Sequence, residues 1–249
     1  MLQRIARMPW VIAYGNWLFK YRNAVFPLVM VALFLGFRPV LWRGSLAADA
    51  WLDGLGLVVA LTGQGLRAAV IGYAYIKRGG VNKRIHADQL VTEGLFAHAR
   101  NPLYVGNLLI LAGLFIIHNH PAVYMLGGLY FVSAYIAIVA AEERFLSDKF
   151  GGAYDDYCRR VPRWLPDLRG LRDTLGQMEF NWRRVVIKDY ASAYTWMMTA
   201  LLIFAYEGMA PAGWRMRRGC LVLALAAALT LVFVVVRVLK KRRLLREAA

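Results

Sequence analysis

The stretch NPLYVGNLLILAGLFIIHNHPAVYMLGGLYFVSAYIAIVAA, residues 101–141, contains no Asp, Glu, Lys or Arg. A single α-helix of 41 residues would be roughly 60 Å long, about twice the thickness of the hydrocarbon core of a bilayer. The segment must therefore fold back on itself. The polar, helix-breaking group His118-Asn119-His120-Pro121 marks where a turn fits. We predict two membrane-spanning helices joined at this point.

The rest of the chain has the same apolar character. Of its 249 residues, 59% are hydrophobic and 18% are charged, whereas soluble domains carry about 25% charged residues. This composition excludes an ordinary soluble globule, a disordered chain and a disulfide-stabilised secreted domain. Nearly uncharged runs predict four further spans, over 23–42, 54–76, 190–206 and 219–236. The expected fold is all-α, a multi-pass integral membrane helical bundle of about six transmembrane helices.

Lys and Arg residues are distributed unequally between the two sides of this bundle. In the six-span arrangement 24 of the 31 fall on one side and five on the other, while Arg67 and Arg237 lie within spans. By the positive-inside rule, the richer side is cytoplasmic and holds both termini. We attribute the net charge of +16 to orientation in the bilayer, which is the expected partner, and not to nucleic acid. The sequence does not determine the oligomeric state.

We divide the chain into three units. Residues 1–23 form a cytoplasmic interfacial leader, residues 24–166 a membrane core, and residues 167–249 a C-terminal extension with two spans and a basic tail. Polar side chains concentrate in two cytoplasmic segments, 77–101 and 142–189. A receptor or transporter needs polar groups within its spans or on both faces. The pattern instead predicts a membrane scaffold with a site that faces the cytoplasm.

The first cytoplasmic segment leads into TEGLFAHARNPLYVG, residues 92–106. Proline disfavours helix at the residue before it and suits the first helical position, so we expect Asn101 as N-cap and Pro102 as the first helical residue. A helix N-terminus beside Arg100 is suited to binding a carboxylate or a phosphate. The alternative is that Arg100 anchors lipid headgroups and Asn-Pro only caps the helix.

The second segment starts with Glu142-Glu143 at the end of an apolar helix, where cations are the favoured charge. This placement indicates that at least one of the two glutamates meets a positive group. Adjacent helical residues differ by about 100°, so only one faces the bundle. Tyr154 and Tyr157 share a helical face. Alternatively, the glutamates are solvated and the tyrosines line the membrane interface.

Together the two segments resemble a known family. Arg-Asn-Pro-Leu-Tyr-Val-Gly at 100–106, then Glu142-Glu143, Phe150-Gly151, Tyr154, Tyr157 and Val161-Pro162-Arg163, are similar to motifs of the isoprenylcysteine carboxyl methyltransferase and phospholipid methyltransferase family. Gly65-Leu66-Arg67 is similar to the helix that precedes them. The resemblance covers roughly residues 55 to 166. Asn101 departs from the pattern, because many members have His before the proline.

The resemblance implies an S-adenosylmethionine-dependent methyltransferase that modifies a carboxyl, amine or thiol group of a lipid-like or prenylated acceptor. It implies Arg163 and Glu143 as catalytic residues, and Arg67, Arg163 and Trp164 as substrate-binding residues. The implied cofactor-binding residues are His98, Arg100, Asn101, Pro102, Tyr104, Gly106, Glu142, Glu143, Tyr154 and Tyr157. A zwitterionic cofactor with a sulfonium fits cationic, anionic and aromatic groups of this kind. No metal is expected, because His and Cys residues lack ligand spacing.

The sequence leaves open the role of Arg67 and the choice between three functions. Arg67 lies roughly 15 Å deep in its predicted span, so it has a structural or substrate role inside the bundle, or the span is shallower and brings it to the interface. The rival functions are an NADPH-dependent membrane sterol or steroid reductase, which has a similar Arg-x-Pro-x-Tyr segment, and a non-enzymatic lipid-binding membrane protein. The paired Glu142 and Glu143 favour the methyltransferase.

Overall fold

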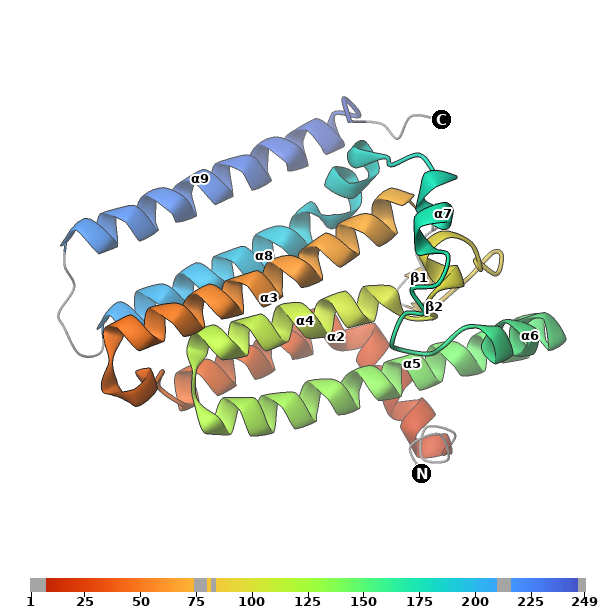
Figure 1. Ribbon diagram of the computed structural model, residues 1–249, viewed down its shortest axis with the longest axis horizontal. Coiled ribbons are helices and arrows are strands. Elements are labelled where there is room, and N and C mark those ends of the chain that lie inside the picture. The colour runs from red at the N-terminus through yellow and green to blue at the C-terminus, as the bar shows by residue number, and fades with distance from the viewer. Residues whose placement is uncertain (1–7, 74–79, 82–83, 210–215, 246–249) are drawn as a thin grey trace.

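The computed structural model describes residues 8–73, 80–81, 84–209 and 216–245. Within these ranges the protein is a bundle of long helices, and its strands are two residues each, which confirms the all-α expectation (Figure 1). The long helices are α2 (Pro9–Gly36), α3 (Leu46–Tyr73), α4 (Pro102–His118), α5 (Gly128–Phe150), α8 (Trp182–Met209) and α9 (Met216–Lys241).

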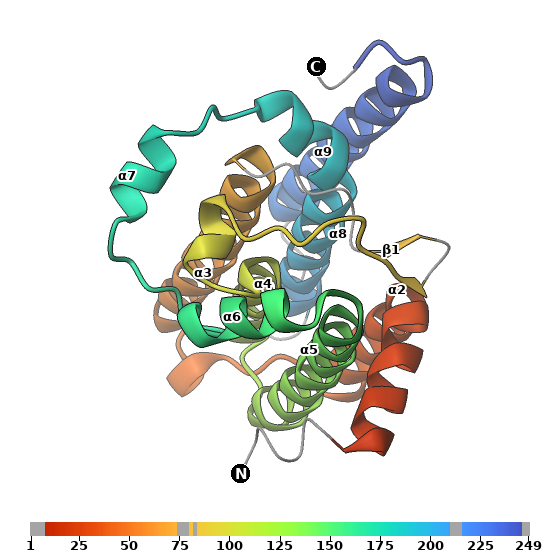
Figure 2. The same cartoon turned by 90° about the vertical axis from the view of Figure 1, so that its right-hand side faces the viewer.

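The short elements gather mainly at one end of this bundle (Figure 2). They are the antiparallel strands β1 (Gly80–Val81) and β2 (Arg84–Ile85), the 3-10 turn η2 (Gly94–Ala97), and the helices α6 (Gly152–Arg160) and α7 (Leu171–Gly176). Two further turns, η1 (Trp42–Gly44) and the π-helical η3 (Val123–Gly127), connect helices elsewhere. We call the end that carries α6 and α7 the capped end.

The number of membrane spans is about four by length and composition, not the six expected. The helices long and apolar enough to cross a membrane are Pro9–Gly36, Ala47–Tyr73, Val123–Phe150 and Gly219–Lys241, in the part of the chain that the structure describes. Helix α4 has 17 residues, which is only about 25 Å of helix. Helix α8 carries charged residues near both ends. Both nevertheless run alongside the other long helices (Figure 1).

The predicted reversal inside the uncharged stretch is confirmed. Helix α4 ends at His118, and Asn119 adopts a left-handed conformation with φ 47°, which asparagine tolerates better than most residues. The Asn119 side chain donates a hydrogen bond of 2.7 Å to the carbonyl oxygen of Val40. This bond fastens the turn to the connection between α2 and α3.

Helices α3 and α4 approach closely along glycines. A Cβ on Gly113 would lie 2.7 Å from the Cβ of Ala60, and a Cβ on Gly63 would lie 2.8 Å from the Cβ of Leu109. Neither space admits a side chain. Small residues commonly bring membrane helices together in this way, because apolar burial gives helices little reason to associate in lipid.

Helix α2 runs through residue 23 without a break, so the leader and core that we separated there are joined by one helix. Figure 1 shows its N-terminal part inclined to the rest of the bundle. Pro27 lies inside the helix, and an internal proline removes a backbone hydrogen bond and bends a helix. Gly15 provides the close approach to α5, because its Cβ would lie 3.0 Å from that of Ala141.

Candidate functional site

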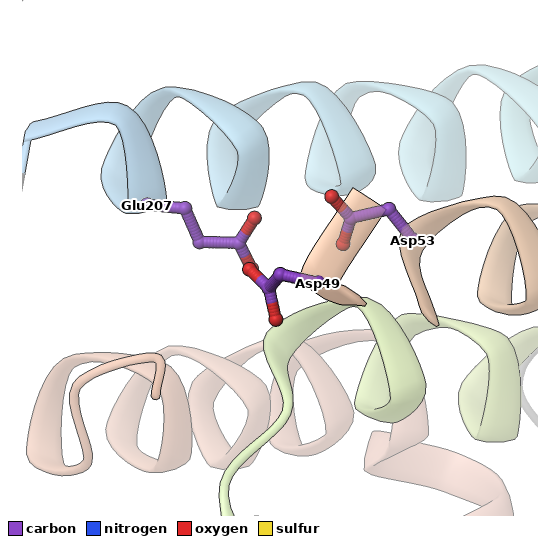
Figure 3. Close-up of side chains that lie close together, drawn as sticks. All are labelled: Asp49, Asp53 and Glu207. Carbon is purple, nitrogen blue, oxygen red and sulfur yellow. The ribbon is translucent and has the colours of Figure 1, made fainter. Parts of the chain in front are cut away.

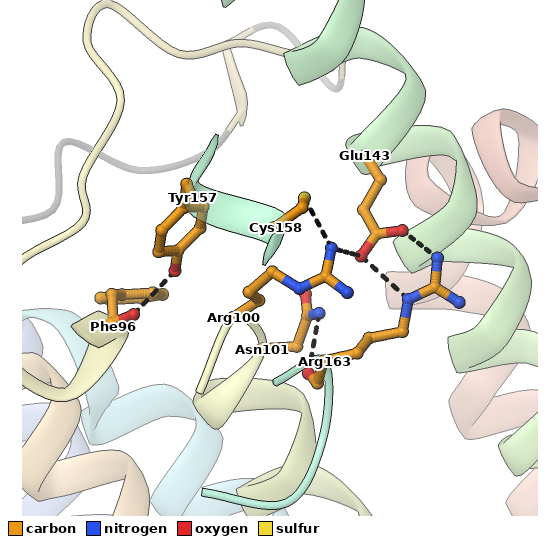
Figure 4. Close-up of polar contacts among 7 residues, drawn as sticks. All are labelled: Phe96, Arg100, Asn101, Glu143, Tyr157, Cys158 and Arg163. Carbon is orange, nitrogen blue, oxygen red and sulfur yellow. Dashed lines mark hydrogen bonds and ion pairs between the residues drawn. The ribbon is translucent and has the colours of Figure 1, made fainter. Parts of the chain in front are cut away.

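Glu143 lies at the centre of a charged cluster at the capped end (Figure 4). Its Oε1 atom accepts a hydrogen bond of 2.9 Å from Nε of Arg163 and forms an ion pair of 2.9 Å with Nη1 of Arg100. Its Oε2 atom pairs with Nη2 of Arg163. The carboxylate therefore holds together the last turns of α5, the segment before α4 and the segment after α6. This confirms that one of the two glutamates meets a positive group.

The cluster carries more positive than negative charge, because two guanidinium groups share one carboxylate. Burial by itself lowers the pKa of Arg100, but the carboxylate of Glu143, with smaller contributions from Cys158 and Tyr154, raises that pKa above its ordinary value. Nη1 of Arg100 also donates to Sγ of Cys158 at 2.8 Å, whereas its buried Nε has no hydrogen-bond partner within the described residues. The cluster thus retains capacity to bind an anion.

Glu142 faces a different set of partners, inside the bundle. The hydroxyl of Tyr104 donates a 2.6 Å hydrogen bond to its Oε1 atom. Arg22 of α2 in turn donates to that hydroxyl at 3.2 Å, and its guanidinium lies 4.3 Å from the ring centre of Phe19. The two adjacent glutamates therefore belong to two separate polar groups, one on each side of α5.

The start of α4 matches the sequence expectation. Asn101 occupies the N-cap position and Pro102 the first helical position. However, the Asn101 side chain does not bond to the helix amides; it donates to the carbonyl oxygen of Arg163 at 3.1 Å. The backbone N–H of Arg100 donates to the carbonyl oxygen of Pro162 at 2.9 Å. These two bonds align the segment after α6 beside the start of α4.

Both ring nitrogens of His98 have partners in α7 or in the segment that leads to it. Its ring nitrogens lie 2.6 Å from the carbonyl oxygen of Asp167 and 2.9 Å from Oγ1 of Thr174. Its own carbonyl oxygen accepts a 2.9 Å bond from the N–H of Asp167. His98 is also buried. In this arrangement it fastens the chain that follows α6, and it has no ring nitrogen left for a ligand.

Tyr154 and Tyr157 are both buried and pack α6 against its neighbours, with Val161. The hydroxyl of Tyr157 donates a 2.8 Å bond to the carbonyl oxygen of Phe96 (Figure 4). Burial raises the pKa of Tyr154, with a further contribution from Glu143, and burial also raises the pKa of Tyr157. Trp164, which follows Arg163, is half-buried.

Arg67 lies inside the bundle and makes an ion pair with Asp189 of α8. It also donates to Oδ1 of Asn107 of α4. The other carboxylate oxygen of Asp189 accepts a 2.7 Å bond from Gln64, whose own Oε1 accepts a 2.8 Å bond from the indole of Trp196. Gly106 makes room for Arg67, because a Cβ on Gly106 would lie 2.6 Å from its Cγ. This network joins α8 to α3 and α4.

The sequence of the chain is similar to that of several named proteins. The profile of the phospholipid methyltransferase family matches residues 54–153. The cobalt-zinc-cadmium resistance protein CzcN of Cupriavidus metallidurans is 31% identical over 158 residues, which are 63% of this chain and 68% of that protein. The chain belongs to the phospholipid methyltransferase family. It is therefore an integral membrane protein and a methyltransferase, which requires a methyl donor.

Two other relatives, both named as enzymes, match a smaller share of this phospholipid methyltransferase family protein. Protein-S-isoprenylcysteine O-methyltransferase of Mus musculus is 31% identical over 49% of this chain and 44% of its own length. Protein-S-isoprenylcysteine O-methyltransferase B of Arabidopsis thaliana is 27% identical over 47% of this chain and 60% of its own length. No solved structure matches the chain with significance. The family profile ends before Tyr154, Tyr157, Arg163 and Trp164.

Sequence reasoning missed several partners of the methyltransferase's candidate residues. Arg22 was assigned to the leader, because Lys20 and Asn23 beside it mark the polar edge of the predicted span. Cys158, Asp167 and Thr174 gave no signal, because each acts through a contact with a residue at least 58 positions away. Only the folded chain brings these residues to the site.

Three carboxylates lie close together (Figure 3), in the first turns of α3 and the last turn of α8, which meet at the end of the bundle away from α6 and α7 (Figure 1). Asp49 and Asp53 of α3 and Glu207 of α8 each place one oxygen within 4.8 Å of the others. Asp49 is partly satisfied, because its Oδ1 accepts a 3.1 Å bond from the backbone N–H of Trp42. The group takes no part in the Glu143 cluster of the methyltransferase. Three carboxylates this close together disfavour one another's ionised form, because their like charges repel.

Proposed function

We propose that the protein transfers a methyl group from S-adenosylmethionine to a lipid-like or prenylated acceptor at the cytoplasmic face of a membrane. The observation that carries the proposal is the cluster of Glu143, Arg100 and Arg163 beside the N-terminus of α4. The orientation with both termini and the site in the cytoplasm is supported by the excess of Lys and Arg on that side.

The donor set of the capped end fits this cofactor. S-adenosylmethionine carries a carboxylate, an ammonium and a sulfonium, and it supplies an electrophilic methyl group when bound. Arg100, whose buried Nε has no partner within the described residues, would hold the carboxylate together with the α4 N-terminus. Glu143 would hold the ammonium. Methyl transfer depends mainly on such positioning, because reactants held in line need little acid-base assistance.

The choice of base depends on the acceptor. A carboxylate or thiolate acceptor needs no base, whereas an amine acceptor must lose a proton. Both ring nitrogens of His98 are bonded, and Glu143 is shared by two arginines. Glu142 therefore remains as the group that would accept a proton, with Tyr104 and Arg22 fixing its position.

The acceptor reaches the site sideways from the bilayer, while the cofactor arrives from the cytoplasm. The long helices expose apolar side chains to the surroundings, so an acceptor with a long chain partitions into the membrane before it meets the site. Its reactive head would lie near Tyr104 and Arg163, at headgroup depth. Turnover with matched acceptors of different alkyl or prenyl length tests this. Equal rates for short, water-soluble and long acceptors would contradict it.

A titration with two cofactors tests the proposed activity against its main rival. The purified protein should bind S-adenosylmethionine and not NADPH, and Glu143→Gln should weaken that binding at least about tenfold, which is about 1.4 kcal/mol. Arg159→Gln is the matched control, because Arg159 pairs with Asp156 on the exposed surface of α6. Binding of NADPH alone would favour the reductase, and binding of neither would favour a non-enzymatic lipid-binding protein.

A further inference from the structure

A groove of about 450 Å³ lies between α2, α5 and strand β2. Its volume falls within the roughly 300–1,000 Å³ of typical small-molecule sites. Ile12, Phe19, Ile85 and Phe145 are among the apolar residues of its lining. Figure 2 shows α2 beside α5, near the hairpin. The groove is formed by the first turns of one membrane helix and the last turns of another, so it lies at a membrane boundary.

The groove is separate from the Glu143 cluster. It is lined by Ala141 and Phe145 of α5, and each of these is two positions from Glu143, or about 200° around the helix. The helix itself therefore stands between the groove and the two arginines that bind Glu143. A ligand in the groove would occupy a second site, on the other face of α5.

The polar residues of the groove have a net positive charge. Lys20 and Arg144 are both exposed there, and Asp148 is the acidic residue. The Lys20 ammonium lies 5.0 Å from the ring centre of Tyr21 and forms no ion pair within the described part of the chain. Arg144 pairs with Asp148 at 3.0 Å, but both side chains are more than half exposed. An exposed pair of this kind contributes little to stability and yields easily to a stronger anion.

The neighbouring face of α2 indicates the depth of the groove in the membrane. Trp10, Tyr14, Trp17 and Tyr21 are all exposed, and their spacing places them on one stripe of the helix. Exposed Trp and Tyr residues are typical of the headgroup region of a bilayer. The cations of the groove, which belong to the same turns of α2, therefore lie at the depth of lipid phosphates.

We propose that the groove between α2 and α5 binds one phospholipid with an anionic headgroup. The phosphate contacts Lys20 and Arg144, and the acyl chains lie along Phe19 and Phe145. The net charge of the groove complements a headgroup with one negative charge, so an anionic lipid binds more tightly than a zwitterionic one. The lipid joins α2 to α5 next to the hydrogen bond from Arg22 to Tyr104. This binding does not depend on methyl transfer.

Native mass spectrometry of the full-length protein in detergent tests the proposal. Phosphatidylglycerol should form a one-to-one complex with at least about fivefold higher affinity than phosphatidylcholine of the same chains. The double variant Lys20→Gln, Arg144→Gln should lose this preference, whereas Arg160→Gln, which changes an exposed cation of α6, should retain it. Asn16→Trp, at an exposed position of the groove, should weaken binding of both lipids and leave the helix content unchanged.

Three results would overturn the proposal. The first is equal affinity of the wild-type protein for the two lipids. The second is a preference that persists in the double variant. The third is one-for-one displacement of phosphatidylglycerol by a prenylated carboxylate, which would assign the groove to the methyl acceptor. All three are read from binding alone, so a failure of the proposed methyltransferase activity is recorded separately.

Discussion

Replacing Glu143 by glutamine removes the negative charge at the centre of the site and keeps the shape of the side chain. The carboxylate accepts two contacts of 2.9 Å and one closer contact from Arg100 and Arg163, and its side chain is 13% exposed. A hydrogen bond to a charged group contributes about 1.5–3 kcal/mol. Since the glutamine variant leaves two guanidinium groups without a carboxylate, we expect a loss of about 2–4 kcal/mol in the free energy of unfolding.

The loss should appear both in stability and in turnover. For a chain of this size, about 2–4 kcal/mol lowers the melting temperature by roughly 5–15 °C. Methyl transfer should fall at least about tenfold for Glu143→Gln and for Arg163→Ala. Thermal unfolding in detergent and transfer of a radiolabelled methyl group measure the two effects. Arg159→Gln, which breaks an exposed pair, should cost less than about 0.5 kcal/mol.

A double-mutant cycle decides whether the pair acts as the structure indicates. Glu143→Gln and Arg163→Gln together should cost less than the sum of the single changes, by at least about 1 kcal/mol, because each single change leaves its partner unpaired. Additivity within about 0.5 kcal/mol would refute the direct contact. An effect of Arg159→Gln as large as that of Glu143→Gln would show that the site is misplaced.

Three further changes test other parts of the structure. Arg22→Gln should lower kcat at least about fivefold with an unchanged KM for the cofactor, because Arg22 acts through Tyr104. Arg22→Lys should restore part of the rate. A change in the cofactor KM alone would contradict this role. Asp189→Asn, which leaves Arg67 unpaired inside the bundle, should destabilise the protein by about 3 kcal/mol in chemical unfolding, and an unchanged midpoint would argue against the ion pair. Glu207→Gln should leave the melting temperature near neutral pH within about 2 °C of the wild type, because the amide replaces a carboxyl group that two neighbouring carboxylates keep protonated. A fall of more than about 5 °C would show that the ionised carboxylate is needed.

Features that depend on neighbouring residues or on composition were predictable from the amino-acid sequence. The length of the uncharged run at 101–141 required a reversal, and the polar group at 118–121 located it. The order of Asn101 and Pro102 fixed the start of α4 within one residue. The ordered motifs from Arg100 to Arg163 indicated the family, which the comparisons confirm. Helix capping, helix breaking and transfer into a bilayer are all governed by residues close together in the chain.

The pairing of charged groups, in contrast, follows from the packing of the folded helices. Glu142 and Glu143 are adjacent and chemically identical, yet the packing of α5 against α2 and α4 on one side and the α6 segment on the other gives them different partners. Arg67 finds Asp189 across 122 positions, and Arg22 finds Tyr104 across 82. The number of helices that qualify as spans is about four, because the folded α4 has only 17 residues and α8 carries charged residues near both ends. Such pairings depend on how helices that are far apart in the sequence pack in space. A pattern of neighbouring residues carries no information about that packing.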